Sequence, residues 1–228
     1  MNDADKTRLN KLLALRLGVS RREADDLIDA GKVTIDGQTA TLGARTLETA
    51  VIEVGGQPLV ASPSFRYVAF HKPAGYVCSR KSQGENPTIY DLLPQDMHVL
   101  KPVGRLDKDS SGLILLTNDG DFAHSMTHPK FSKVKVYDVS LDAPLAPLHQ
   151  QMIADYGIEI GDGTSKLSLE RRGDDRTNWI VTMNEGRNRQ IRRTFASLGY
   201  AVTSLHRKSF GTFNIGELAS GETRAVSP

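Results

Sequence analysis

The sequence has few of the features that would indicate a secreted or membrane protein. Its 228 residues include a single cysteine, Cys78, so no disulfide can form within the chain. No stretch approaches the roughly 20 apolar residues that a membrane span requires. The first residues, MNDADKTRLNK, contain no apolar run resembling a signal peptide. We therefore expect a soluble, cytoplasmic protein with no membrane partner.

A surplus of either charge is also missing. The 29 lysines and arginines nearly balance the 27 acids, and the hydrophobic fraction of 39% is that of a soluble globular protein. This balance permits a nucleic-acid partner without requiring one, so the distribution of the cations has to decide. The sequence contains no P-loop, Rossmann fingerprint or metal-ligand cluster, and it therefore predicts no cofactor and no metal.

Residues 6 to 30 have the pattern of two short helices. Leucines spaced by three and four residues form the apolar stripe of the first helix, which Gly18 ends. Ser20 and Glu23 form a capping box that begins the second helix. Strands are expected next, at 33–35 before the tight turn Asp36-Gly37 and at 51–54.

Cations gather on the first of these helices and at the start of the second. On charge alone, a solvated helix face explains them as well as RNA contact does. However, the run TRLNKLLALRLGVSRREADDLIDAGKVTIDGQ resembles the S4 domain, a small RNA-binding module, with Asn10 where the family usually has Asp. The resemblance implies RNA contacts from Arg8, Lys11, Arg21, Arg22 and Lys32.

Residues 59–65 contain prolines and serines and are expected to link an S4-like domain, 1–58, to a second domain, 66–228. In the second domain, residues 67–71 are a candidate strand that ends at the turn Lys72-Pro73-Ala74-Gly75. The polar tract 80–87 is expected to be a loop, and it is a candidate to close on RNA although most such loops only connect elements.

The stretch VGRLDKDSSGLILLT, residues 103–117, combines a polar loop with an apolar run. Residues 113–116 predict a strand buried on both sides, and a loop held by such a strand is a usual place for catalytic groups. From spacing alone, Asp107 is better explained as a turn residue paired with Arg105 or Lys108.

GRLDKDSSGLILLTNDGD resembles the active-site motif of the pseudouridine synthases, and within them the RsuA/RluB/RluE/RluF family that modifies ribosomal RNA. HKPAGYVCS resembles the opening motif of the same enzymes, with His71 replacing the commoner Asn. The resemblance runs from about Arg8 to Arg224. It implies an α+β protein, whose catalytic domain has a mainly antiparallel mixed sheet flanked by helices.

The C-terminal half predicts strands around 133–141, 167–169 and 179–183 and a helix at 147–155. Ile191, Phe195 and Leu198 give a further helix one buried stripe, with Gly199 after its end. Four arginines lie near the start of this helix and no acid follows them within it, so we expect a phosphate-binding surface rather than a solvated face. His206, Arg207 and Lys208 extend this basic character. His124 and His128 favour a structural or phosphate-contacting role over a metal pair.

The resemblance also implies roles for individual residues. Asp107 would attack the anomeric carbon of a uridine or remove a ribose proton, and the sequence leaves that choice open. Tyr137 would stack on the extruded base, and Arg187 would pair with Asp107. Ile191 would line the base pocket. Substrate contacts are further expected from Arg105, Leu106, Arg189, Arg192 and Arg193.

The predicted function is therefore isomerisation of a specific uridine in ribosomal RNA to pseudouridine, with the target base flipped out, by a monomer that meets its RNA free or within an assembling subunit. The spellings NRQIRR and GRLDKD slightly favour a large-subunit over a small-subunit target. A non-catalytic RNA-binding protein would need the S4-like module and the arginines but not Asp107, Tyr137 and Arg187 together. A retaining glycosidase would need a second carboxyl group, such as Asp109, roughly 5 Å from the first.

Overall fold

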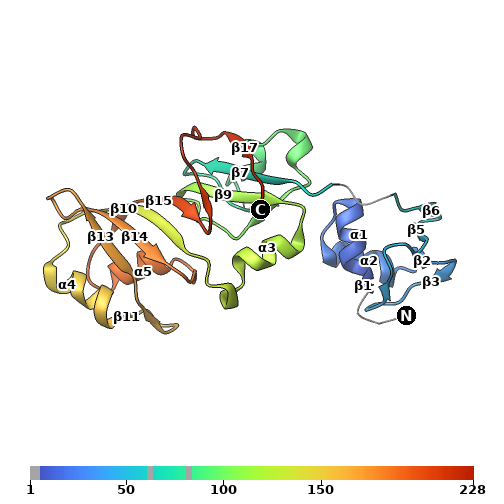
Figure 1. Ribbon diagram of the computed structural model, residues 1–228, viewed down its shortest axis with the longest axis horizontal. Coiled ribbons are helices and arrows are strands. Elements are labelled where there is room, and N and C mark those ends of the chain that lie inside the picture. Colours follow the sequence, from blue (N-terminus) through green and yellow to red (C-terminus); the bar gives the residue numbers. More distant parts are fainter. Residues whose placement is uncertain (1–5, 61–63, 81–83) are drawn as a thin grey trace. The chain divides into compact units, whose positions relative to one another are not determined.

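The computed structural model describes residues 6–60, 64–80 and 84–228 (Figure 1). The chain divides into two compact units, Met1–Phe65 and Arg66–Pro228. Parts of the predicted linker and of the predicted loop 80–87, namely residues 61–63 and 81–83, lie outside the described residues. Both units combine helices with small or mixed sheets, so the predicted α+β class is confirmed. None of the described helices is long and apolar enough to cross a membrane.

The first unit packs two short helices against a small sheet. Its sheet order is β3-β2-β5-β6, and β1 pairs separately with β4. The elements of this unit are β1 (Thr7–Arg8), α1 (Leu9–Leu17), α2 (Arg21–Asp29), β2 (Val33–Ile35), β3 (Gln38–Thr39), β4 (Arg45–Thr46), β5 (Ile52–Val54) and β6 (Gln57–Pro58).

The local signals read from the sequence of this unit are confirmed. Gly18 follows α1 with φ 71°, and Ser20 and Glu23 form the reciprocal capping box of α2. Asp36 and Gly37 both have positive φ, which a tight turn of the hairpin type requires. Leucines of α1, with Ala24, Ile28 and Val33, form a core that belongs to this unit.

The second unit is built on one mixed sheet of nine strands, whose main order is β13-β14-β10-β15-β9-β7-β17. β8 pairs with β9 and β16 pairs with β15. The strands are β7 (Tyr67–Lys72), β8 (Lys101–Val103), β9 (Ser111–Thr117), β10 (Lys135–Leu141), β13 (Ser168–Arg172), β14 (Asn178–Met183), β15 (Val202–Phe210), β16 (Phe213–Asn214) and β17 (Thr223–Ala225), with a separate pair β11 (Ile158–Glu159) and β12 (Thr164–Ser165).

The described residues of this unit form three α-helices beside the sheet: α3 (Gly120–Thr127), α4 (Pro147–Gln151) and α5 (Gln190–Ala196). In Figure 1, α4 and α5 lie at the end of the unit that carries β10, β13 and β14, whereas α3 lies near β9. Short 3₁₀ turns occupy Ile89–Asp91, Gln95–Met97 and Pro129–Phe131.

The two halves of the sheet meet along a short parallel contact. Among the described strands, β9 and β15 form the only parallel pair, through His206 opposite Ser111 and Arg207 opposite Gly112. Gly112 has φ 107°, and a Cβ added there would overlap the backbone of Arg207. A glycine at this position therefore lets β15 approach the strand that follows the predicted catalytic loop.

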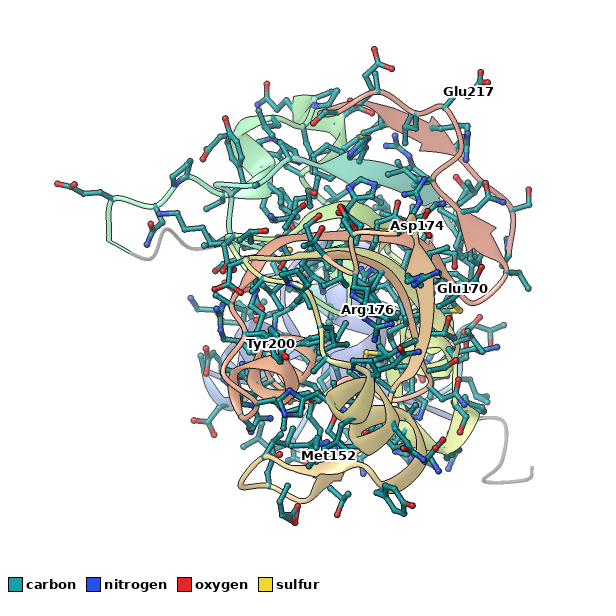
Figure 2. The ribbon with its side chains drawn as sticks, turned by 90° about the vertical axis from the view of Figure 1, so that its left-hand side faces the viewer. Met152, Glu170, Asp174, Arg176, Tyr200 and Glu217 are labelled. Carbon is teal, nitrogen blue, oxygen red and sulfur yellow. The ribbon has the colours of Figure 1, made fainter. Side chains whose placement is uncertain are left out.

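The predicted helix at 147–155 is regular only in its first part. α4 ends at Gln151, and Met152–Tyr156 continues as a π-helical turn. The guanidinium of Arg176 holds this region by donating to the carbonyl of Leu145 at 2.6 Å, and the hydroxyl of Tyr200 accepts the amide of Ala146 at 3.1 Å. Figure 2 labels Met152, Arg176 and Tyr200 among the side chains of this end of the unit.

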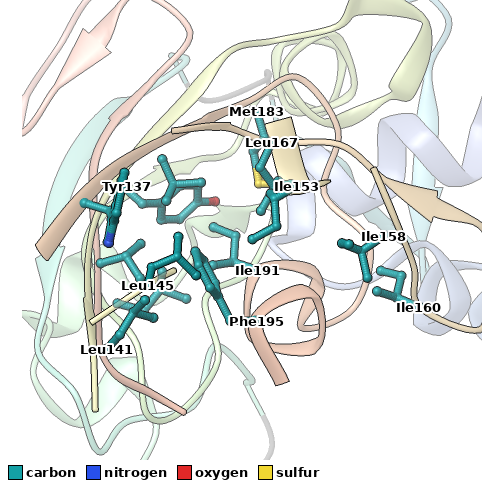
Figure 3. Packing of buried hydrophobic residues seen from close by; sticks show 14 of the residues in the cluster. Tyr137, Leu141, Leu145, Ile153, Ile158, Ile160, Leu167, Met183, Ile191 and Phe195 are labelled. Atoms are coloured by element: carbon teal, nitrogen blue, oxygen red, sulfur yellow. The ribbon is translucent and has the colours of Figure 1, made fainter. Parts of the chain in front are cut away.

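The largest apolar cluster lies between α5 and the strands β10, β14 and β15. Figure 3 shows Tyr137 and Met183 of the sheet together with Ile191 and Phe195 of α5. The predicted helical stripe is confirmed for Ile191 and Phe195, which belong to α5 and are buried against the sheet. Leu198 lies just beyond the end of α5 and is partly buried. This packing fixes Tyr137 and Ile191 relative to each other.

Candidate active site

The polar loop Gly104–Gly112 is hydrogen-bonded to a buried lysine. Lys72, at the end of β7, has no exposed surface, and its Nζ donates to the carbonyls of Ser110 at 2.6 Å and Asp107 at 3.1 Å. Burial lowers the pKa of Lys72, although nearby Cys78, Asp107 and Asp109 oppose this effect. The predicted burial of residues 113–116 in β9 is confirmed, so the loop is fixed at both its base and its end.

A cavity of about 450 Å³ opens beside this loop. A volume of this order accommodates a small ligand. Seven of the residues singled out in the sequence lie around it: Arg105, Leu106, Asp107, Tyr137, Arg187, Arg189 and Ile191. Arg192 and Arg193 are not among the residues that line it. The cavity therefore brings together residues that are up to 86 positions apart in the sequence, from Arg105 to Ile191.

Tyr137 forms part of the cavity wall from the middle of β10. The predicted alternation of this strand is confirmed, because Tyr137, Val139 and Leu141 are buried on one face. Ile191 of α5 and Met183 of β14 belong to the same apolar cluster and also line the cavity (Figure 3). An aromatic ring and apolar side chains beside a partly buried carboxylate suit a flat, partly polar ligand.

The guanidinium that approaches Asp107 comes from Arg189. Its Nη1 lies 3.5 Å from Oδ2 of Asp107, and the two side chains are 44% and 31% exposed. The predicted pairing of Arg187 with Asp107 is wrong for this structure, in which Arg187 contacts Asp162 at 3.2 Å and Glu185 at 3.0 Å. Arg187 forms ion pairs with these two acids instead of with Asp107.

Asp109 is bound by two arginines. Nη1 and Nη2 of Arg189 donate to its two carboxylate oxygens at 3.1 and 3.2 Å, and Nε of Arg192 lies 3.3 Å away. Burial by itself raises the pKa of Asp109, but the hydrogen bond from Arg189 and the charges of Arg192 and Arg189 outweigh it and leave that pKa below its ordinary value. Asp109 therefore serves as an anchor for the arginines beside Asp107.

The arginines of 187–193 have acidic partners that the local sequence does not reveal. No acid follows within α5, but acids from other segments reach them: Asp162 pairs with Arg193 at 2.8 Å as well as with Arg187. Hydrogen bonds from Arg193 lower the pKa of Asp162. In the described structure these arginines thus form an ion-pair network around the cavity rather than a row of free cations.

His124 and His128 lie together, as their spacing of four predicts, with ring centroids 4.7 Å apart. His128 ends α3 and lines the cavity. The described residues contain no group of three or more His, Cys, Asp or Glu side chains that could hold a metal ion.

The sequence analysis gave no site role to Lys133 and Lys135 of the cavity wall, and it named Arg207 only as part of a basic stretch. Lys135, two residues before Tyr137 on β10, lines the cavity, and so does Arg207 of β15. Burial lowers the pKa of Lys135, and the charge of Arg207 lowers it further. Period-two alternation could have placed Lys135 on the face of Tyr137. The position of Arg207 depends on the pairing of β15 with β10, which no local pattern reveals.

In the first unit, the five cations expected to contact RNA lie on or beside α1 and α2. Arg8, Arg21, Arg22 and Lys32 are exposed, and Lys11 is partly buried. Asn10, the departure from the usual S4 pattern, accepts a hydrogen bond from Arg21 at 3.1 Å and donates to Asp25 at 2.9 Å. Asn10 therefore links the two helices and orients Arg21.

Comparison with known proteins agrees with this arrangement. Residues 66–197 match the family described as RNA pseudouridylate synthase, and residues 7–50 match the S4 domain. The chain is 36% identical over 223 residues to ribosomal small subunit pseudouridine synthase A of Pasteurella multocida, covering 96% of both chains. It is 33% identical over 229 residues to ribosomal large subunit pseudouridine synthase B of Bacillus subtilis, covering 97% of this chain and 92% of the relative.

A crystal structure of a pseudouridylate synthase is also similar, with a TM-score of 0.69 and 33% identity over 96% of both chains. The match covers the S4 segment and the segment that carries the cavity. The chain therefore belongs to the RNA pseudouridylate synthase family and is a pseudouridine synthase with an N-terminal S4 domain.

Proposed function

We propose that this enzyme converts a specific uridine of ribosomal RNA to pseudouridine and that Asp107 is its catalytic carboxylate. The observation that carries the proposal is the placement of Asp107 and Tyr137 on one cavity of about 450 Å³, with Ile191 beside them. The names of relatives for both ribosomal subunits support an RNA target of the ribosome. The spelling of residues 188–193 favours the large subunit.

The proposed reaction begins when the target nucleotide leaves its stack and its base enters the cavity. Stacking on Tyr137 replaces part of the stacking lost in the RNA, a contribution of about 1–3 kcal/mol for a base on an aromatic ring. Asp107 then acts at the ribose, either by attack on C1′ or by removal of a sugar proton. Arg189 orients the carboxylate, and Ile191 excludes water from the base.

Binding of the RNA is proposed to involve both units. The S4 domain supplies the cations Arg8, Lys11, Arg21, Arg22 and Lys32 to the phosphate backbone. Near the cavity, Arg105 and the network of Arg187, Arg192 and Arg193 exchange some of their carboxylate partners for phosphates of the strand that enters. We propose that the enzyme acts in the cytoplasm as a monomer, because one chain carries the whole cavity.

The test is to map carbodiimide-modified pseudouridines across both ribosomal RNAs from cells with and without the gene. We expect one modified position to vanish on deletion and to return with the wild-type gene. Asp107→Asn is expected not to restore it, while purified Asp107→Asn retains the RNA affinity of the wild type. The matched control is Asp174→Asn, which makes the same change at an exposed carboxylate of the β13–β14 turn. Full modification by Asp107→Asn would exclude Asp107 as the catalytic group.

A further inference from the structure

A buried arginine lines the cavity and has no role in the reaction as described so far. Arg207 of β15 is 2% exposed and lines the cavity. Its Nε donates to the carbonyl of Leu113 at 2.7 Å, whereas its Nη2 is buried and has no hydrogen-bond partner among the described residues. Arginine stays protonated in proteins, so the buried end of this side chain carries a positive charge.

Among the described residues, no acid forms an ion pair with this charge. None of the ion pairs between described residues involves Arg207. Its charged neighbours are Lys72 and Lys135, and its charge lowers the pKa of both in addition to their burial. Glu185, which faces Lys135, is bound by Arg187. Arg207 therefore carries a buried positive charge that no ion pair between described residues neutralises.

One aromatic ring offers partial compensation. The guanidinium carbon of Arg207 lies 5.0 Å from the centroid of Phe210, and Nζ of Lys135 lies 5.2 Å from the same centroid. A cation–π contact of this kind is weaker than a buried ion pair, and here two cations share one ring. A buried charge without a counter-ion is strongly unfavourable, so a ligand that brings negative charge into the cavity would be bound preferentially.

The position of Arg207 indicates which part of a ligand it would meet. Arg207 lies opposite Tyr137 in the antiparallel pairing of β10 and β15, so both side chains project from the same face of the sheet. Tyr137 is the proposed platform for the extruded base. A base stacked on Tyr137 would therefore lie next to Arg207.

Resting on the proposed function, we propose that Arg207 is a catalytic residue that stabilises the negative charge of the uracil while it is detached from the ribose. When the C1′–N1 bond breaks, its electron pair stays on the uracil and spreads over N1, O2 and O4. C1′ is meanwhile bonded to the Asp107 carboxylate, or the sugar has lost a proton to it. When C5 bonds to C1′, the bond between C1′ and the Asp107 carboxylate breaks, or Asp107 returns the proton to the sugar. C5 then releases its own proton and N1 gains one, so the isomerisation balances.

This role needs a cation that is fixed and shielded from water before the bond breaks. The hydrogen bond to Leu113 and the packing against Phe210 fix Arg207, and its burial removes solvent screening. A charge placed in this way stabilises the transition state without reorganising during the reaction. Arg189, which is half-exposed and faces Asp107, acts on the sugar side of the same bond.

The test compares Arg207→Gln and Arg207→Lys with wild type in single-turnover reactions on ribosomal RNA that carries either uridine or 5-fluorouridine at the mapped target. Fluorine stabilises the anion of the leaving base, so the reaction depends less on a stabilising cation. We expect Arg207→Gln to break the glycosidic bond of uridine about 100-fold more slowly than wild type, as for the loss of one oxyanion donor. With 5-fluorouridine the deficit should shrink several-fold, and Arg207→Lys should fall between the two enzymes.

Each result has a defined meaning. Arg171→Gln, the same substitution at an exposed arginine of β13, should match wild type on both RNAs. A purely structural role for Arg207 predicts equal deficits with uridine and 5-fluorouridine, and that result would overturn the proposal. Failure of the wild-type enzyme to modify any ribosomal RNA would instead refute the proposed function, and this inference with it.

A measurement on wild type alone covers the case in which both Arg207 variants fail to fold. RNA carrying a barbiturate ribonucleoside at the target presents a base of uracil shape that is already an anion at neutral pH. We expect wild type to bind it about 100-fold more tightly than the uridine RNA, as analogues of a charged transition state are bound. Equal affinity for the two RNAs would show that the cavity does not favour an anionic base.

Discussion

Asp107 shares its cationic partner with a second carboxylate. Nη1 of Arg189 lies 3.5 Å from Asp107 and 3.1 Å from Asp109. Asp109 binds Arg189 and is itself contacted by Arg192. The position of Arg189 is therefore restrained before any RNA is bound. A long side chain that is already ordered loses less conformational entropy when substrate arrives. Asp109 is therefore best understood as a positioning residue for the guanidinium beside Asp107.

This geometry predicts different consequences for two neighbouring arginines. Arg189→Gln removes the cation nearest to Asp107, and we expect the single-turnover rate to fall about 100-fold, the cost of a catalytic group misplaced by about 1 Å. Arg187→Gln disturbs Asp162 and Glu185 instead, so we expect it to weaken substrate binding more than it slows the chemical step. Single-turnover rates at saturating enzyme, with RNA affinities measured separately, check both.

The control for this pair is Arg224→Gln, which removes a guanidinium near the end of the chain that donates to the carbonyl of Asn214 and lies outside the cavity lining. A larger loss of single-turnover rate in Arg187→Gln than in Arg189→Gln, with both variants folded, would mean that Arg187 is the working partner of Asp107 once RNA is present.

The motif places both arginines near the cavity, but it does not distinguish them. Arg189 has φ 47° and precedes α5, and this left-handed conformation directs the chain differently from the extended form. Arg187 meets Asp162, which is 25 positions earlier in the sequence. Neither the backbone angle nor the distant acid can be deduced from residues 185–193 themselves, which is why the predicted pairing was wrong.

At the scale of elements, the loop that carries Asp107 depends on a strand that lies 30 or more residues earlier. Lys72 of β7 donates to the carbonyls of Ser110, Asp107, Pro73 and Lys108, at 2.6, 3.1, 3.0 and 3.4 Å. These carbonyls face the buried ammonium group and leave the loop little freedom. The orientation of Asp107 is thus set by β7 as well as by β9.

Lys72→Met should therefore loosen the loop and lower stability. It keeps most of the apolar stem but leaves buried carbonyls without a donor, which we expect to cost about 2–4 kcal/mol of unfolding free energy. Activity should fall together with stability, because Asp107 loses a backbone support. Denaturant unfolding combined with single-turnover rates measures both effects, and a variant with wild-type stability would rule out the bonds to the loop as a significant support.

The same pair of proteins tests the titration of Lys72. Burial lowers the pKa of Lys72, so the unfolded chain binds more protons than the folded chain between that lowered pKa and the ordinary value of about 10.4. The contribution of Lys72 to stability therefore rises with pH across this window. The difference in unfolding free energy between wild type and Lys72→Met should widen as pH is raised. A difference that stays constant with pH would contradict a lowered pKa for Lys72.

Local signals predicted the elements well where the determinants are local. The capping box of Ser20 and Glu23, the turn at Asp36-Gly37 and the alternation of β10 are all present. The π-helical turn after Gln151 and the parallel contact of Arg207 with Gly112 were not predicted. Both depend on packing between distant segments, and the second brings Arg207 to the cavity.

At the scale of the molecule, each unit has its own apolar core. Leu9, Leu12 and Leu13 pack with Ala24 and Ile28 in the first unit, and the clusters of the second unit contain no residue before Val68. Separate cores allow one unit to be removed without exposing the interior of the other. The contribution of the S4 domain to RNA binding can therefore be measured while the second unit, Arg66–Pro228, stays folded.

Deletion of residues 1–58 should weaken RNA affinity strongly. The unfolding midpoint of the remaining chain should change little. Five cations of the S4 domain are proposed to contact phosphates, and each lost contact should reduce the slope of log affinity against log salt by about 0.7 on single-stranded RNA. Affinities measured from low to physiological salt, with thermal unfolding of both proteins, provide the values.

The matched variant keeps the full chain and changes Arg8, Lys11, Arg21, Arg22 and Lys32 to Gln. If these five side chains account for the RNA binding of the S4 domain, the full-length variant should lose most of the salt dependence of affinity that the deletion protein loses. The reason is that counter-ion release depends on their charges. Arg21 also donates to Asn10, so thermal unfolding of the variant must be measured first. A full-length variant with wild-type slope beside a weakened deletion protein would assign RNA contact to other surfaces of the S4 domain.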